Sequence, residues 1–182
     1  MMAPAMPQAG WLIVSQETAI EPGLWFVFHA GEDGILALDL TTPHAALSYR
    51  PFLAALHREP DEAVILKGGP EGGEDALTIL HTSAAKGPDS HPAGEDFAFR
   101  SFRYNLIPGH PPAIMTPDSA PTRISLSAHE PFLVVAGFRL WDAATLRQEM
   151  EAGLWTLLPA TPDIVFRTPH QARRARALNL VN

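Results

Sequence analysis

The feature of this sequence that most limits its fold is the number and spread of its prolines. The chain has 18 prolines in 182 residues, about twice the usual share. They run from Pro4 to Pro169 and do not gather in one linker. Proline breaks helix interiors and central strands, so each one marks the edge of a short element. The pattern predicts a compact, turn-rich fold and argues against a helical bundle.

Composition places the chain among ordinary globular proteins. Hydrophobic residues make up 46% and charged residues 18% of the sequence. The length suits one hydrophobic core, and no repeat or linker divides the chain, so we expect a single domain over residues 1–182. The sequence has no cysteine. Disulfide scaffolds, thiolate metal sites and cysteine nucleophiles are therefore excluded.

The sequence also bears on location. Residues 1–10 lack the basic residue and the apolar centre of a secretory signal. No apolar run approaches the roughly 20 residues that a membrane-spanning helix needs. We therefore expect a cytoplasmic protein without a membrane segment.

Charge limits the partners that this chain can take. The net charge is −7, which repels polyanions, so we do not expect non-specific nucleic-acid binding. The chain has one basic cluster, near its C-terminus: Arg167, Arg173, Arg174 and Arg176. On a helix that starts at Pro169, we expect Ala172, Ala175 and Leu178 to face the protein and the arginines to face solvent. Such a face is either an ordinary solvated surface, which we favour, or a patch for nucleic acid or an acidic partner.

Short apolar runs predict the strands. They occur at residues 11–14, 24–28, 34–40, 63–67, 76–81, 132–136 and 154–158, and a further strand begins at Phe97. The second and third runs are expected to form a hairpin around the turn at 31–34. The glycine-rich segment 68–75 is expected to be a wide hairpin turn rather than a phosphate-binding loop, because it contains Pro70 and two acids and precedes a strand.

Helix signals are fewer. We expect one helix from Ser48 to about Arg58, and one that Asp142 caps and Gly153 ends. Two Thr-Pro pairs, at 161–162 and 168–169, predict two more helix starts. Residues 82–96 read as a mobile surface loop, and for residues 113–128 strand and helix both remain open.

Six short motifs follow one another along nearly the whole chain: Leu12-Ile13-Val14, Gly68-Gly69-Pro70, Leu80-His81, Gly137-Phe138-Arg139-Leu140-Trp141, Leu154-Trp155 and Pro159-Ala160-Thr161-Pro162. In this order they resemble the AlgH-like (YqgE-type) family of small bacterial proteins. Thr41-Thr42-Pro43 stands where that family has Asn-Arg-Pro, so the chain looks like a divergent member.

The resemblance implies an α+β fold in which a curled, branching mixed and antiparallel sheet surrounds a small barrel and is flanked by helices. It also brings the family's label of transcriptional regulator. Our first hypothesis is a non-enzymatic binding or regulatory protein with an unknown protein or small-molecule partner. The alternative is a small-molecule sensor or enzyme with a pocket near Gly68, Gly69, Pro70, His81 and Trp141.

Patterns that would indicate catalysis are missing from the sequence. No two histidines have the His-Glu-x-x-His spacing of a metal site, and no Gly-x-Ser-x-Gly elbow occurs. We therefore predict no metal, no cofactor and no catalytic residue, while a triad is defined by geometry and not by sequence order. His81, at a strand end, is the histidine most worth locating. Trp141, between a glycine and a helix cap, is expected to be a buried packing residue.

Overall fold

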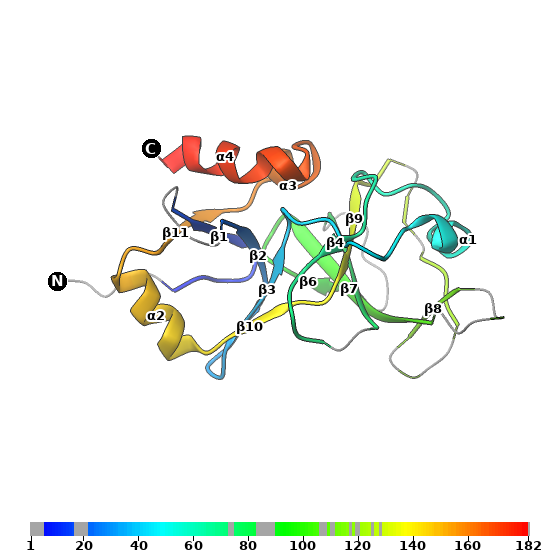
Figure 1. Cartoon of the computed structure of the whole chain (residues 1–182), viewed down its shortest axis with the longest axis horizontal. Helices are drawn as coiled ribbons and strands as arrows, with labels where there is room; N and C mark the ends of the chain where they lie inside the picture. The colour runs from blue at the N-terminus through cyan, green and yellow to red at the C-terminus, as the bar shows by residue number, and fades with distance from the viewer. Residues whose placement is uncertain are drawn as a thin grey trace.

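The structure is a computed structural model. It describes residues 6–16, 22–72, 75–82, 90–105, 109, 112–116, 118, 121–124, 126–127 and 129–181. Within these residues the chain forms two β-sheets and a few short helices, so the expected α+β class is confirmed (Figure 1).

The first sheet is antiparallel throughout. Its strands, in spatial order, are β10 (Arg139–Trp141), β3 (Ile35–Asp39), β2 (Leu24–Ala30), β1 (Trp11–Ser15) and β11 (Trp155–Pro159). The expected hairpin is β2 and β3, joined at residues 31–34. Both faces of this sheet are buried, because side chains alternate along each strand. Leu12 and Val14 enter one apolar cluster, and Ile13 between them enters another.

Helices cover both faces of the first sheet. In Figure 1, α3 (Pro162–Phe166) and α4 (His170–Val181) lie on one side and α2 (Ala143–Glu151) on the other. All three start where the sequence predicts. Asp142 caps α2 by accepting from the backbone N–H of Thr145 at 3.0 Å, and Thr161 caps α3 by accepting from Ile164. No helix among the described residues is long and apolar enough to cross a membrane.

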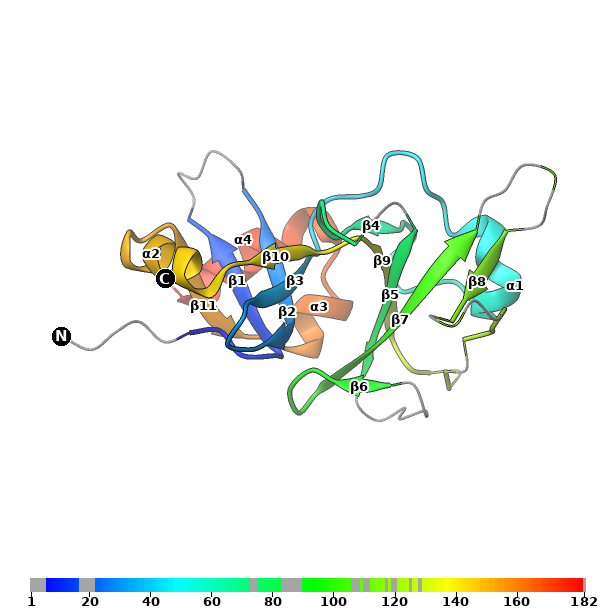
Figure 2. The same ribbon diagram turned by 90° about the horizontal axis from the view of Figure 1, so that it is seen from below.

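The second sheet is mixed. Its order is β4 (Leu66–Lys67), β9 (Phe132–Ala136), β5 (Ala76–Thr82), β7 (Phe97–Asn105) and β6 (His91–Pro92), and β8 (Ala113–Met115) also pairs with β7. Figure 2 shows the long strand β7 reaching from β6 at one end to β8 at the other. Strands β4 and β9 are parallel, and the other pairs are antiparallel.

This order overturns the expected hairpin at residues 68–75. Strand β9 lies between β4 and β5 and pairs with both of them. Strands β4 and β5 are therefore not paired neighbours, and the glycine-rich segment does not join the two strands of a hairpin. Local sequence could not show this, because the intervening strand comes more than 50 residues later in the chain.

Three further expectations need correction. The described strands form two open sheets and no closed barrel; β10 and β11, the edges of the first sheet, are joined through α2 and not through hydrogen bonds. The helix expected from Ser48 shrinks to a 3₁₀ turn (Arg50–Phe52) and α1 (Leu53–Leu56), because His57 adopts a left-handed φ of 67°. Within residues 82–96, the described part is not a free loop. It contains β6, and Ala93 is fully buried.

Candidate functional site

His81 lies near the end of β5, in the middle of the second sheet. It pairs with Phe132 of β9 on one side and with Ala98 of β7 on the other. The histidine is fully buried, and a carboxylate is buried with it. Its Nδ1 atom lies 3.0 Å from Oε1 of Glu130. Glu130 stands two residues before the start of β9. Side-chain exposures of 0% and 2% place this pair out of contact with bulk water.

Hydrogen-bond partners fix the tautomer of His81. Its Nδ1 atom also lies 2.9 Å from the carbonyl oxygen of Thr82. A carbonyl oxygen can only accept, so Nδ1 must carry the proton. In the neutral ring, Nε2 is then left with a lone pair and acts as an acceptor. The hydroxyl of Thr82 donates to the same Glu130 oxygen at 3.1 Å, which holds the carboxylate in place.

Ser90 completes the arrangement. Its Oγ atom lies 3.2 Å from Nε2 of His81, on the side of the ring opposite Glu130. Ser90 is only partly buried, whereas the two groups behind it are enclosed. Strand β6 follows it directly, and the Ala93 backbone N–H donates to the Phe97 carbonyl at 2.9 Å, so the segment is held against β7. The hydroxyl of a partly buried serine, a buried imidazole and a buried carboxylate thus form one hydrogen-bonded chain.

One carboxylate oxygen in this hydrogen-bonded series lacks a partner. The second carboxylate oxygen of Glu130, Oε2, is buried and has no hydrogen-bond partner among the described residues. A buried acceptor without a donor is energetically costly, by about 1–3 kcal/mol.

The glycines of the expected binding loop are used for close backbone packing. A Cβ atom on Gly68 would lie 2.3 Å from the carbonyl oxygen of Gly137, and one on Gly69 would lie 2.4 Å from the carbonyl carbon of Phe138. Gly137 itself has φ 78°, and a Cβ atom on it would lie 2.5 Å from the carbonyl oxygen of Gly69. The Gly-Gly-Pro motif and the glycine–tryptophan segment therefore touch each other where the chain passes from β9 into β10. Pro70 is exposed beside this contact.

Trp141 is a buried packing residue, as expected, with 2% of its surface exposed. Its ring meets Trp25 and Trp155 edge-on, with centroids 5.3 and 5.4 Å away. The guanidinium of Arg139 stacks on Trp141 at 3.7 Å from the ring centroid. A cation among aromatic rings is a stabilising contact, and here the protein supplies both partners.

The five residues of the predicted pocket do not converge. His81 pairs with Phe132 at one end of β9, whereas the Gly68 N–H donates to the Ala136 carbonyl at the other end. Four strand residues at about 3.3 Å each separate those ends by roughly 13 Å. Trp141 lies further away, in the first sheet. Of the expected candidates, His81 alone sits in a cluster of polar side chains. The role of the others in ligand binding stays a prediction.

The structure contradicts the outward-facing basic patch at its centre, because Arg173 is fully buried. Its guanidinium donates to the carbonyl of Leu40 at 2.7 Å, to that of Val165 and to Oε2 of Glu62 at 2.9 Å. Burial lowers the pKa of Arg173 from its ordinary value, and the Glu62 charge partly counteracts this. The buried stripe of α4 is Arg173, Ala177 and Leu178, whereas Ala175 is exposed.

The other three arginines are divided among different surroundings. Arg174 is half-buried and donates to Ser15 and to the carbonyl of Gln16. Arg176 is exposed and pairs with Asp163, and Arg167 is exposed after α3. The cluster in the sequence is therefore not a continuous patch on the surface. A three-residue repeat predicted the wrong face because the α4 stripe follows positions i, i+4 and i+5.

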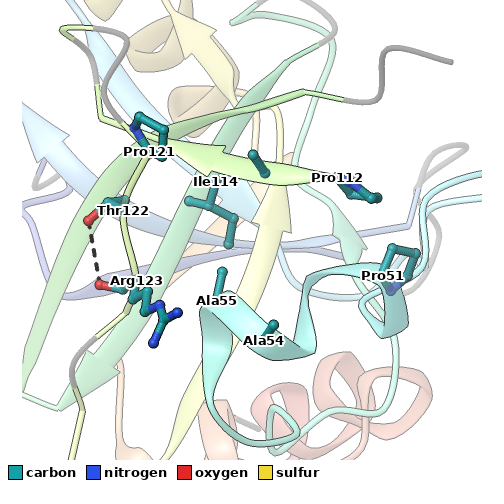
Figure 3. Close-up of a pocket in the computed structure, with 9 residues that line it drawn as sticks. Pro51, Ala54, Ala55, Pro112, Ile114, Pro121, Thr122 and Arg123 are labelled. Carbon is teal, nitrogen blue, oxygen red and sulfur yellow. Dashed lines mark hydrogen bonds between the residues drawn. The ribbon is translucent and has the colours of Figure 1, made fainter. Parts of the chain in front are cut away.

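A cavity of about 440 Å³ lies away from His81, between α1 and β8 (Figure 3). Its walls are mostly prolines, alanines and Ile114. The side chain of Thr122 turns to the Arg123 carbonyl, at 3.5 Å, and not into a cluster of polar groups. This cavity offers apolar surface without converging chemistry. The described residues hold no group of three histidines and acids that could bind a metal ion.

Ser90 and Glu130 were missed in the sequence. Ser90 lies in a segment that reads as a loop, and Glu130 is 49 residues from His81. Neither residue sits in a motif. The Leu80-His81 pair was the only signal, and it marks the histidine without its partners.

Most of the sequence is similar to one family of known proteins. The sequence profile of a family described as AlgH-like matches residues 16–182. A UPF0301 protein of Shewanella loihica is 25% identical over 89% of this chain and 82% of its own length. The UPF0301 protein YqgE of Salmonella typhi is 25% identical over 91% of this chain and 85% of its own.

Two solved structures share the fold. The AlgH protein from Pseudomonas aeruginosa, a solution structure, has a TM-score of 0.60 and 18% identity, and the match covers 98% of this chain and 93% of that one. Protein DIP2367 from Corynebacterium diphtheriae, a crystal structure, has a TM-score of 0.62 and 14% identity, with coverage of 97% and 90%.

Proposed function

We propose, starting from the fact that this chain belongs to the AlgH-like family, that it is a binding or regulatory protein that senses a small polar molecule at His81. The proposal takes residues 1–182 as one domain. The observation that supports it most is the hydrogen-bonded chain of Ser90, His81 and Glu130. Ligand sites typically combine a few converging polar groups with apolar walls.

The chemistry of the site indicates the kind of ligand. The side chains of His81 and Glu130 are enclosed, so Ser90 is the member of the three that a ligand would contact. Ser90 is only partly buried, and its hydroxyl can rotate toward a ligand. A hydroxyl- or amine-bearing molecule suits such a residue, because the serine hydroxyl both donates and accepts hydrogen bonds. Apolar molecules are disfavoured, because they offer the Ser90 hydroxyl no hydrogen-bond partner.

The finer role of transcriptional regulator, which the family label suggests, gains no support from the arginines. Arg173 is enclosed, and Arg176 is paired with Asp163. If the protein regulates transcription, we expect it to do so through a protein partner or a bound small molecule and not through non-specific contact with DNA.

The proposal is tested by a ligand screen that also locates the binding site. Wild-type protein is mixed with single compounds from a panel of small alcohols, amines and hydroxy acids, and backbone amide shifts are followed by NMR. We expect at least one compound to shift the amides of Thr82 and Ala93, with binding weakened in Ser90→Ala. Hits that map instead to the cavity around Ile114 would overturn the assignment to His81. A matched control is Ser127→Ala, which changes an exposed serine outside the site.

A further inference from the structure

Ser90, His81 and Glu130 stand in the relative positions of a catalytic triad. The hydroxyl lies 3.2 Å from Nε2 of His81, and the carboxylate lies 3.0 Å from Nδ1 of the same ring. Nucleophile and acid are thus on opposite nitrogens, within hydrogen-bond reach of a base that a third group orients. Unrelated folds reach this arrangement with different chain orders, so geometry defines it.

The protonation of the ring is the one that a general base needs. Two acceptors, the Thr82 carbonyl and the Glu130 carboxylate, hold the proton on Nδ1. Nε2 therefore presents its lone pair to the Ser90 hydroxyl.

The three residues differ in how deeply they are buried. The side chains of His81 and Glu130 are enclosed, so the positive charge that His81 gains on accepting a proton faces the Glu130 carboxylate in a medium of low dielectric constant. Thr82 donates to that carboxylate as well and keeps it aligned. Ser90, at the edge of the sheet before β6, is the member of the three that an outside molecule reaches first.

We infer that Ser90 is a nucleophile for acyl transfer, with small carboxylic esters as the substrate class. This inference rests on the proposed ligand site at His81 and assigns it a reaction. His81 is the general base, and Glu130 is a positioning residue that orients and stabilises it.

The reaction balances without any further reagent than water. The Ser90 oxygen attacks the ester carbonyl carbon while its proton passes to Nε2 of His81. The tetrahedral adduct collapses, the carbon–oxygen bond of the ester breaks, and the leaving alcohol takes the proton from Nε2. Water then gives a proton to Nε2 and attacks the acyl-serine. The second tetrahedral adduct that forms then collapses, the bond between the acyl carbon and the Ser90 oxygen breaks, and Ser90 takes the proton from Nε2. Ester and water thus yield a carboxylic acid and an alcohol.

An activity-based probe tests the nucleophile directly. An organic fluorophosphonate forms a bond from phosphorus to an activated serine oxygen and releases fluoride. We expect intact-mass analysis of the wild type to show one adduct, and peptide mapping to place it on Ser90. The Ser90→Ala variant loses the adduct, while Ser127→Ala keeps it. His81→Gln lowers the labelling rate by at least about 100-fold, the usual contribution of a general base.

Two measurements keep the inference testable if a buried variant fails to fold. Ser90→Ala removes one hydroxyl from a partly buried residue, and its fold is checked by circular dichroism. Release of nitrophenol from p-nitrophenyl acetate is then compared with the wild type, and we expect a loss of at least about 100-fold. Equal rates in the two proteins, or labelling at another serine, would overturn the nucleophile. Amide shifts at Thr82 from a bound compound without any labelling would leave the ligand site standing and refute catalysis alone; the absence of both would refute both.

Discussion

Trp141 carries more packing than its neighbours in the sequence suggest. The ring is buried, touches two other tryptophans and has Arg139 stacked on it. Asp142, the next residue, is exposed and contributes only a helix cap. We expect Trp141→Ala to lower the free energy of unfolding by about 3–5 kcal/mol, and Asp142→Ala by about 1 kcal/mol. Urea denaturation measures both, and equal losses would contradict the packing role of the ring.

Alanine substitutions at Gly68 and Gly153 test two different effects, a steric clash at the first and backbone strain at the second. A Cβ on Gly68 meets a backbone carbonyl at 2.3 Å, whereas a Cβ on Gly153 meets nothing within 4 Å but sits at φ 76°. A backbone atom cannot move aside as a side chain can. We therefore expect Gly68→Ala to destabilise by about 3 kcal/mol, the upper end for overpacking, and Gly153→Ala by about 1 kcal/mol. A larger loss of thermal stability in Gly153→Ala than in Gly68→Ala would contradict the close backbone contact between Gly68 and Gly137.

At the scale of elements, Arg173 joins α4 to two other parts of the chain. It bonds Leu40 at the end of β3 and Glu62 before β4, and the Glu62 carboxylate also accepts from the first N–H of α4, that of His170. An acid at a helix N-terminus is stabilising. Removing one partner of such a pair leaves a charge in a poorly solvated place.

We expect Arg173→Ala to lower the free energy of unfolding by about 3–5 kcal/mol, since it strands the Glu62 charge. Arg176→Ala, three residues along the same helix, breaks an exposed ion pair with Asp163 and should cost less than about 1 kcal/mol. The comparison is made by guanidinium denaturation of the two variants at one salt concentration. Similar losses would show that α4 is not held by the buried network.

Local signals predicted the elements well and their neighbours poorly. The β2–β3 hairpin and the starts of α2, α3 and α4 could be predicted, because a turn or cap is made by residues close in sequence. The insertion of β9 between β4 and β5 could not, because it joins residues far apart. His81 could be singled out by its place at a strand end, whereas Ser90 lies in a segment that reads as a loop and Glu130 is 49 residues away from the histidine. Arg173 misled because a cation is rarely enclosed, and here three acceptors compensate it.

At the scale of the whole molecule, charge and the family's regulatory label point in different directions. The net charge is −7, and nucleic-acid affinity depends mainly on cations that neutralise phosphates. The arginine cluster that could have supplied them is divided: Arg173 is enclosed, Arg174 is tied to Ser15, and Arg176 is paired. The exposed cations are therefore too scattered to offset the repulsion of the remaining surface.

We accordingly expect no binding of random-sequence duplex DNA at protein concentrations up to about 10 µM in physiological salt, which excludes the tighter half of the usual non-specific range of about 1–100 µM. Fluorescence anisotropy of a labelled duplex measures this, repeated at low salt, where any electrostatic attraction is strongest. The matched variants are Arg167→Glu and Arg176→Glu, which reverse exposed charges without touching the buried Arg173. Salt-sensitive binding by the wild type that both variants abolish would show that the C-terminal arginines do form a nucleic-acid surface, because only phosphate contacts carry that combined dependence.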